Sequence, residues 1–62
     1  MTYTYLIEAL GGAKACLEDA IMASRELARD RRPDAADCGL HLTQIISAIA
    51  YCELLARRGE QS

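Results

Sequence analysis

The chain contains no phenylalanine and no tryptophan, and three tyrosines account for its whole aromatic fraction of 5%. Strands of β-sandwiches are rich in aromatic and β-branched residues, so this composition argues against that fold class. Alanine and leucine supply most of the 52% apolar content, which is too high for a disordered chain. The composition therefore favours closely packed helices.

Neither sign of charge dominates, because seven Lys and Arg stand against nine Asp and Glu for a net charge of −2. This balance offers no electrostatic reason to bind nucleic acid or anionic lipid. The N-terminal residues lack the basic start of a secretory signal. The uncharged stretch 38–52 is too short and too polar to cross a membrane, which takes about 20 apolar residues. We therefore expect a soluble, cytoplasmic protein with no membrane association.

The three cysteines are an odd number and include no CxxC pair, so a disulfide framework is not expected. Cys38 and His41 have the spacing of two zinc ligands on a helix, but the sequence supplies no further ligands near them. The single histidine also lacks a recognisable orienting group for catalysis. The sequence thus predicts no metal, no cofactor and no catalytic residues, and the protein is not expected to be an enzyme.

The single proline, Pro33, divides the chain near its middle, because proline cannot continue a helix from the preceding turn. The sequence predicts one domain of residues 1–62. It consists of a helix over about 4–30, a turn over about 31–34 and a second helix over about 35–58.

Residues with capping chemistry flank the second predicted helix. Asp34 is a suitable N-cap, and Asp37 three residues later forms a weak capping-box pattern with it. Gly59 follows Arg57 and Arg58, which is typical of a helix C-terminus. We expect the helix to end there and the last residues to fray.

Two features of the first predicted helix each allow two interpretations. Thr2 or Thr4 can cap it, but the alternation of threonine and tyrosine over 2–5 also suits an extended segment. Gly11-Gly12 marks either a kink or a close approach of another backbone, and hairpin geometry places Gly12 opposite Cys52. The second alternative predicts that the glycine pair lets the second helix come close.

Apolar residues recur at alternating spacings of three and four, the pattern of helices that pack at a shallow angle. In the first helix this seam is Leu6, Leu10, Ala13, Leu17, Ala20, Ser24 and Leu27, and in the second it is Ala35, Cys38, Leu42, Ile45, Ile49, Cys52 and Ala56. The short turn makes the helices antiparallel neighbours. The predicted fold class is therefore all-α, an antiparallel two-helix hairpin.

The second helix has more apolar surface than one neighbour covers. Leu40, Ile46, Tyr51 and Leu54 lie outside the predicted seam, and a helix that is apolar nearly all round is normally buried. Docking of two hairpins through this helix gives a homodimeric four-helix bundle with a two-fold axis. Tyr3 and Tyr5 come near Tyr51 in this arrangement, either as a binding patch or as a cap on the open end of the bundle.

The tip Arg29-Asp30 through Asp34-Ala-Ala-Asp-Cys38 and the ending Leu55-Ala-Arg-Arg-Gly59 loosely resemble the Rop-type hairpin proteins, which dimerise into four-helix bundles. The resemblance covers the architecture of the whole chain without a specific motif. It implies the alternative function of an RNA-binding helical hairpin that uses the polar face of its first helix. Here that face carries Glu8, Glu18, Asp19 and Glu26 beside Lys14 and Arg25, so nucleic acid is not the expected partner.

The favoured interpretation is a small, non-enzymatic protein–protein interaction module. We expect a homodimeric regulator or inhibitor that binds another protein, of a kind common among bacterial and phage-encoded hairpins. Its predicted interface residues are Leu40, Ile46, Tyr51, Leu54, Tyr3 and Tyr5.

Overall fold

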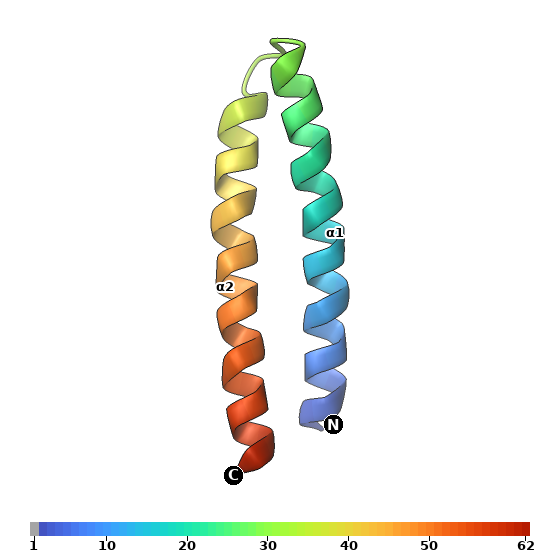
Figure 1. Ribbon diagram of the computed structural model, residues 1–62, viewed down its shortest axis with the longest axis vertical. Coiled ribbons are helices and arrows are strands. Elements are labelled where there is room, and N and C mark those ends of the chain that lie inside the picture. The colour runs from blue at the N-terminus through green and yellow to red at the C-terminus, as the bar shows by residue number, and fades with distance from the viewer. Residues whose placement is uncertain (1) are drawn as a thin grey trace.

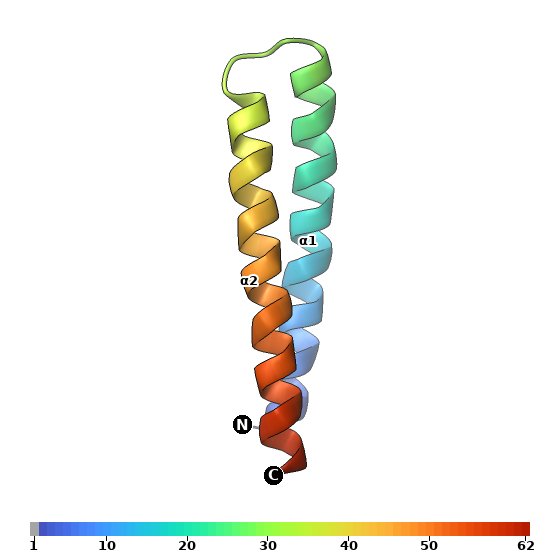
Figure 2. The same cartoon turned by 60° about the vertical axis from the view of Figure 1, so that its left-hand side comes forward.

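A computed structural model describes residues 2–62 as two long antiparallel helices joined by a short loop (Figure 1). Helix α1 spans Tyr3–Arg29 and helix α2 spans Ala35–Gln61, with 27 residues in each. The hairpin measures 48 × 15 × 13 Å. A view turned by 60° shows that the helices cross at a shallow angle (Figure 2). The prediction of an all-α, two-helix hairpin is confirmed.

Side-chain and backbone caps define both ends of α1. The Thr2 hydroxyl accepts a hydrogen bond from the Tyr5 N–H at 3.3 Å, so the chain is helical from Tyr3 and the extended alternative for these residues is wrong. At the other end, the N–H groups of Arg31 and Arg32 donate to carbonyls of the last turn, both at 3.0 Å. This pattern is a Schellman motif, with Arg31 in the left-handed region at φ 57°.

The start of α2 differs from the expected capping. Asp34 does stand at the N-cap position, but its backbone is left-handed, with φ 63°, and its carboxylate makes no capping hydrogen bond. A capping side chain normally projects from an extended backbone, which directs it back toward the N–H groups of the first turn. The predicted capping box between Asp34 and Asp37 is therefore wrong. Asp37 remains in the first turn, where it favours the helix dipole.

Helix α2 continues through Gly59 to Gln61, past the predicted end at residue 58. Contacts with the first turn of α1 explain the difference. The Thr4 hydroxyl donates to Glu60 Oε2 at 3.0 Å, and the Tyr3 ring lies so close to Gly59 that a Cβ there would come within 2.6 Å of it. The end of α2 is thus held by tertiary contacts that override the helix-ending tendency of glycine.

The contact between the helices follows one unbroken heptad pattern, which we call the seam. It consists of Ile7, Leu10, Lys14, Leu17, Ile21, Ser24 and Ala28 in α1 and of Ala35, Gly39, Leu42, Ile46, Ile49, Glu53 and Ala56 in α2. All fourteen residues are buried or half-buried, whereas every other residue of α2 up to Ala56 is exposed.

At about half of its positions, the observed seam contains the residue next to the predicted one. Ile46 lies in the seam and Ile45 is exposed, which is the reverse of the prediction. Cys38 and Cys52 are also exposed, and Gly39 and Glu53 take their places in the seam. The apolar pattern did not distinguish these alternatives, because α2 offers suitable residues on neighbouring faces.

The predicted role of Gly11-Gly12 is also wrong within the hairpin. A Cβ on either glycine would meet nothing within 4 Å outside the adjacent backbone of its own helix. The close approach occurs instead at Gly39, where a Cβ would come within 2.7 Å of the Ser24 Oγ. Helix α1 runs unbroken through both glycines.

Candidate interaction surface

The hairpin buries very few side chains. Among the described residues, Ile21, Ala35, Ala56 and Ser24 are the buried ones, and Ile21 is the only large side chain of the four. Within residues 2–62, ten large apolar residues are exposed: Tyr3, Tyr5, Leu6, Met22, Leu27, Leu40, Ile45, Tyr51, Leu54 and Leu55. A soluble monomer normally buries most such side chains, and contiguous exposed apolar patches mark interaction sites.

One side of the hairpin carries no formal charge along its whole length. We call it the uncharged face, and it consists of Leu6, Ala9, Ala13, Cys16, Ala20, Ala23 and Leu27 in α1 with Cys38, His41, Ile45, Ala48, Cys52, Leu55 and Gly59 in α2. In both helices these residues follow the same alternation of three and four as the seam. Every Asp, Glu, Lys and Arg of the two helices lies at another heptad position.

The direction of the uncharged face relative to the seam suits a four-helix bundle. We call the part of the uncharged face on one helix its stripe. At 3.6 residues per turn, the centre of each stripe lies about 110° around the helix from the centre of the seam. Because the helices are antiparallel, the two stripes come to the same side of the hairpin. A helix in a square bundle contacts its two neighbours at roughly right angles, so each helix has a second packing stripe in the required direction.

A shallow groove of about 400 Å³ confirms that the two stripes meet near the open end of the hairpin. Its lining is Tyr3, Leu6, Leu10, Cys52, Leu55 and Ala56. Leu6 and Leu55 keep 42% and 43% of their surface exposed, although they flank the buried seam. The lining contains no charged residue, which makes the groove suitable for apolar side chains of another chain.

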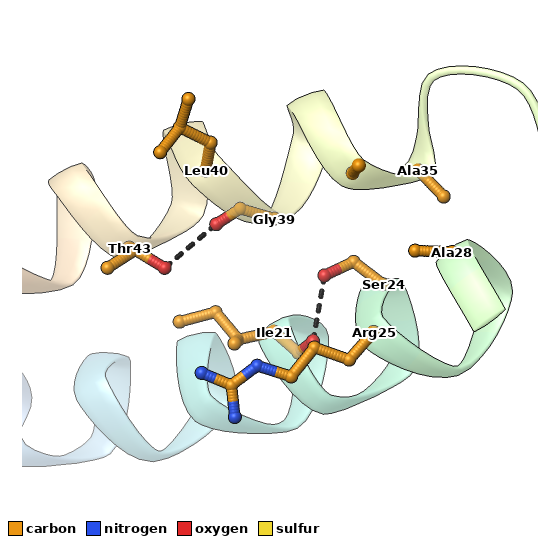
Figure 3. Close-up of a pocket in the computed structure, with 9 residues that line it drawn as sticks. Ile21, Ser24, Arg25, Ala28, Ala35, Gly39, Leu40 and Thr43 are labelled. Carbon is orange, nitrogen blue, oxygen red and sulfur yellow. Dashed lines mark hydrogen bonds between the residues drawn. The ribbon is translucent and has the colours of Figure 1, made fainter.

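A second groove, of about 330 Å³, lies on the other side near the loop (Figure 3). Its two hydroxyl groups donate to backbone carbonyls of their own helices: Ser24 to Ile21 at 2.7 Å, and Thr43 to Gly39 at 2.9 Å (Figure 3). Arg25 lies along its edge (Figure 3). Small residues bring the helices close beside this groove, since a Cβ on Gly39 would come within 2.7 Å of the Ser24 Oγ.

The structure distributes the predicted interface residues over several surfaces. Leu40, Tyr51 and Leu54 are exposed on the outer side of α2, and Leu40 also lines the groove near the loop. Ile46 is half-buried in the seam and therefore unavailable to a partner.

The tyrosines do not form one patch. Tyr3 packs on Gly59 at the open end of the hairpin. Tyr5 and Tyr51 are 60% and 58% exposed and occupy the outward heptad positions of different helices. Interface contacts by these two residues would therefore involve separate surfaces.

Among the single histidine and the three cysteines, only His41 has a hydrogen-bond partner in the described structure. The His41 Nδ1 lies 2.8 Å from the Asp37 carbonyl, which only accepts, so this nitrogen carries the proton and donates. Cys16, Cys38 and Cys52 are free thiols, and all three lie on the uncharged face. Within residues 2–62, no three His, Cys, Asp or Glu side chains gather closely enough to hold a metal ion.

Helix α2 meets the length and composition of a membrane-spanning helix, and none of its apolar window is buried within the hairpin. This differs from the expectation drawn from the uncharged stretch, because the helix is longer than that stretch. The criterion is weak by itself, since the mostly buried core helix of a soluble protein also meets it.

The prediction missed the uncharged face because it treated Leu6, Leu27, Ile45 and Cys52 as part of the contact between the helices. A signal for it was present in the sequence. Charged residues are absent from three heptad positions in α1 and four in α2, more than the two that the contact between the helices uses in each.

Comparison of the chain with protein-family models, curated proteins and solved structures found no match in any of the three.

Proposed function

We propose that the protein is a small, non-enzymatic protein–protein interaction module that works as a homodimeric four-helix bundle. The observation that carries this proposal is the shortage of buried core in a chain of 62 residues. Small domains bury too little apolar surface to be stable by themselves and commonly gain it by association.

The exposed area supports association with a partner of similar size. The hairpin exposes 4849 Å², whereas a folded monomer of 6.8 kDa is expected to expose about 3,950 Å². The difference, about 900 Å², is close to the roughly 800 Å² that each partner contributes to a stable protein interface. Contact with one additional hairpin is thus enough to reduce the exposed area of each chain to the value expected for a folded monomer of its mass.

The regulatory part of the proposal concerns the outer side of α2. Leu40, Tyr51 and Leu54 lie away from the uncharged face, so a bundle formed through that face leaves them exposed. Tyrosine is favoured at the centres of protein interfaces, and apolar side chains on one helix can anchor it in a groove of another protein. In this proposal the target protein binds to the outer side of α2. The present protein acts in the cytoplasm as a regulator or inhibitor of that target.

The RNA-binding alternative lacks comparable support. Lys14 is engaged by Glu53 at 2.9 Å, and Arg57 and Arg58 lie at the opposite end of the hairpin from Arg29. A basic surface of the kind that follows a phosphate backbone requires these cations to be free and close together.

Sedimentation equilibrium of the wild-type protein from 1 to about 100 μM tests the dimer, with circular dichroism on the same samples. We expect the mass of two chains across the micromolar range and high helicity. A stable, fully helical monomer throughout that range would contradict the proposal. Affinity capture with Leu54→Glu as the comparison then tests the target surface, since this variant should remain dimeric and lose the target.

A further inference from the structure

We infer that the second copy docks on the uncharged face in an antiparallel orientation, with α1 against α1 and α2 against α2 across a two-fold axis near Cys16 and Ala48. This inference rests on the proposed homodimer and deepens it by assigning the face and the orientation. Its first support is the absence of Asp, Glu, Lys and Arg from all fourteen positions of that face. Burial of the face therefore desolvates no formal charge.

The exposed large side chains of this face are spread along the hairpin. Leu6 and Leu27 stand near the two ends of α1, and Ile45 and Leu55 flank the middle of α2, each between 42% and 49% exposed. Alanines and cysteines separate them, so the backbones of two copies could approach closely between the leucine contacts. A partner that covers this whole length must itself be a long helical structure, as a second hairpin is.

The order of residues on α1 specifies the orientation. Its stripe reads Leu6, Ala9, Ala13, Cys16, Ala20, Ala23, Leu27, which has the same residue types in either direction from Cys16. At a two-fold axis perpendicular to a helix, residues equally distant on either side of the axis face one another. Leu6 of one copy then meets Leu27 of the other, alanines meet alanines, and Cys16 meets Cys16.

The stripe on α2 fits the same axis. It is centred on Ala48, so that Ile45 meets Cys52 and Cys38 meets Gly59 of the second copy, a larger residue against a smaller one in both cases. The centres of the two stripes also lie at one level of the hairpin. In-chain contacts join Thr4 to Glu60 and Ser24 to Gly39, and the same register places Cys16 beside Ala48. One axis therefore satisfies both helices.

The other two-fold arrangement places both loops at the same end and packs α1 against α2 of the second copy. Cys16 then faces the region of Ala48 and Cys52 instead of another Cys16. The two orientations consequently differ in which thiols come within reach of a disulfide, which requires Cα atoms about 4.4–6.8 Å apart.

Disulfide trapping with diamide tests the orientation, because this reagent takes two hydrogens from a pair of thiols as the S–S bond forms. We expect the Cys38→Ser/Cys52→Ser variant, which retains Cys16, to become a covalent dimer within minutes. The variant that retains Cys52 should not, because its two thiols lie about 12 Å apart along the bundle at 1.5 Å per residue. The variant that retains Cys38 should not either, with about 30 Å between its thiols. Cross-linking only when Cys16 and Cys52 are both present would overturn the antiparallel orientation.

A matched pair of exposed alanines in α2 tests the face. Ala48→Glu places two carboxylates together at the axis and should raise the dimer dissociation constant about 100-fold or more. Ala50→Glu, two residues away and outside the uncharged face, should leave it within about threefold. If the wild-type protein is dimeric and both substitutions change the dimer dissociation constant equally, the assigned face is wrong, whereas the homodimer is not.

Flotation with phosphatidylcholine vesicles tests the lipid alternative. We expect the wild-type protein to remain in the aqueous fraction as a dimer, because α1 accompanies α2 along its length and carries Glu8, Glu18 and Asp19. A monomer in buffer that floats with vesicles, and that Ala48→Glu releases, would overturn both the second-copy inference and the proposed homodimer.

Discussion

The Lys14 Nζ lies 2.9 Å from the Glu53 Oε1, and both residues occupy seam positions between the helices. The carboxylate side chain is 14% exposed and the lysine side chain 38% exposed. The Oε1 is shielded from water and makes no aligned hydrogen bond in the described structure, so its partner is the charge of the ammonium. A paired charge inside an otherwise apolar seam favours the register in which both members meet.

Removal of the lysine alone should destabilise the hairpin. Lys14→Leu leaves the shielded Glu53 carboxylate unpaired, and we expect a loss of about 1–2 kcal/mol, limited by the partial exposure of the lysine. Urea unfolding followed by circular dichroism at a fixed protein concentration measures it. The double variant Lys14→Leu/Glu53→Leu should recover that stability or exceed it. A double variant no more stable than Lys14→Leu would contradict this account.

The neighbouring isoleucines Ile45 and Ile46 should respond differently to the same substitution. Ile46→Asp buries an unpaired carboxylate in the seam and should unfold the hairpin or destabilise it by about 3 kcal/mol or more. Ile45→Asp affects a side chain that is 47% exposed on the uncharged face, so it should weaken the dimer, and helicity should fall only at concentrations where the dimer dissociates. Circular dichroism and sedimentation velocity distinguish these outcomes. The reverse pattern would show that Ile45 occupies the seam.

Replacement of the glycine pair should stabilise the protein. Gly11→Ala and Gly12→Ala introduce methyl groups into open space, and each should gain about 1 kcal/mol from helix propensity. Both positions lie outside the uncharged face, so the dimer dissociation constant should not rise. Thermal unfolding of each variant measures the gain. A loss of stability at either site would reveal a close approach by another chain.

Replacement of Gly39 by alanine should stabilise the protein only when Ser24 is replaced as well. The new Cβ would come within 2.7 Å of the Ser24 Oγ, whose rotation would break the 2.7 Å hydrogen bond to the Ile21 carbonyl. Gly39→Ala alone should therefore gain nothing, because the lost bond offsets the helix propensity. Gly39→Ala/Ser24→Ala removes the conflict and should exceed the wild type by about 1 kcal/mol. Equal stabilities of the single and double variants in chemical denaturation would refute the contact.

The division of the chain into two helices follows from features that act locally. Pro33 prevents continuation of a helix through the middle, and Thr2 caps the first turn of α1. These effects operate within a few residues, so the amino-acid order was sufficient to predict an antiparallel hairpin. The end of α2 was predicted too early because Gly59 is covered by the Tyr3 ring, a contact between residues far apart in the chain.

The face of α2 that meets α1 could not be read from the amino-acid order. Ile45 and Ile46 are chemically equivalent neighbours, and each belongs to a complete pattern of threes and fours. The choice depends on contacts across the hairpin, where Gly39 admits Ser24 and Glu53 reaches Lys14. Local pattern thus establishes that α2 has apolar residues for more than one neighbour. Packing between the helices selects Ile46 for the seam and leaves Ile45 on the uncharged face, because only one of two adjacent side chains points into the contact.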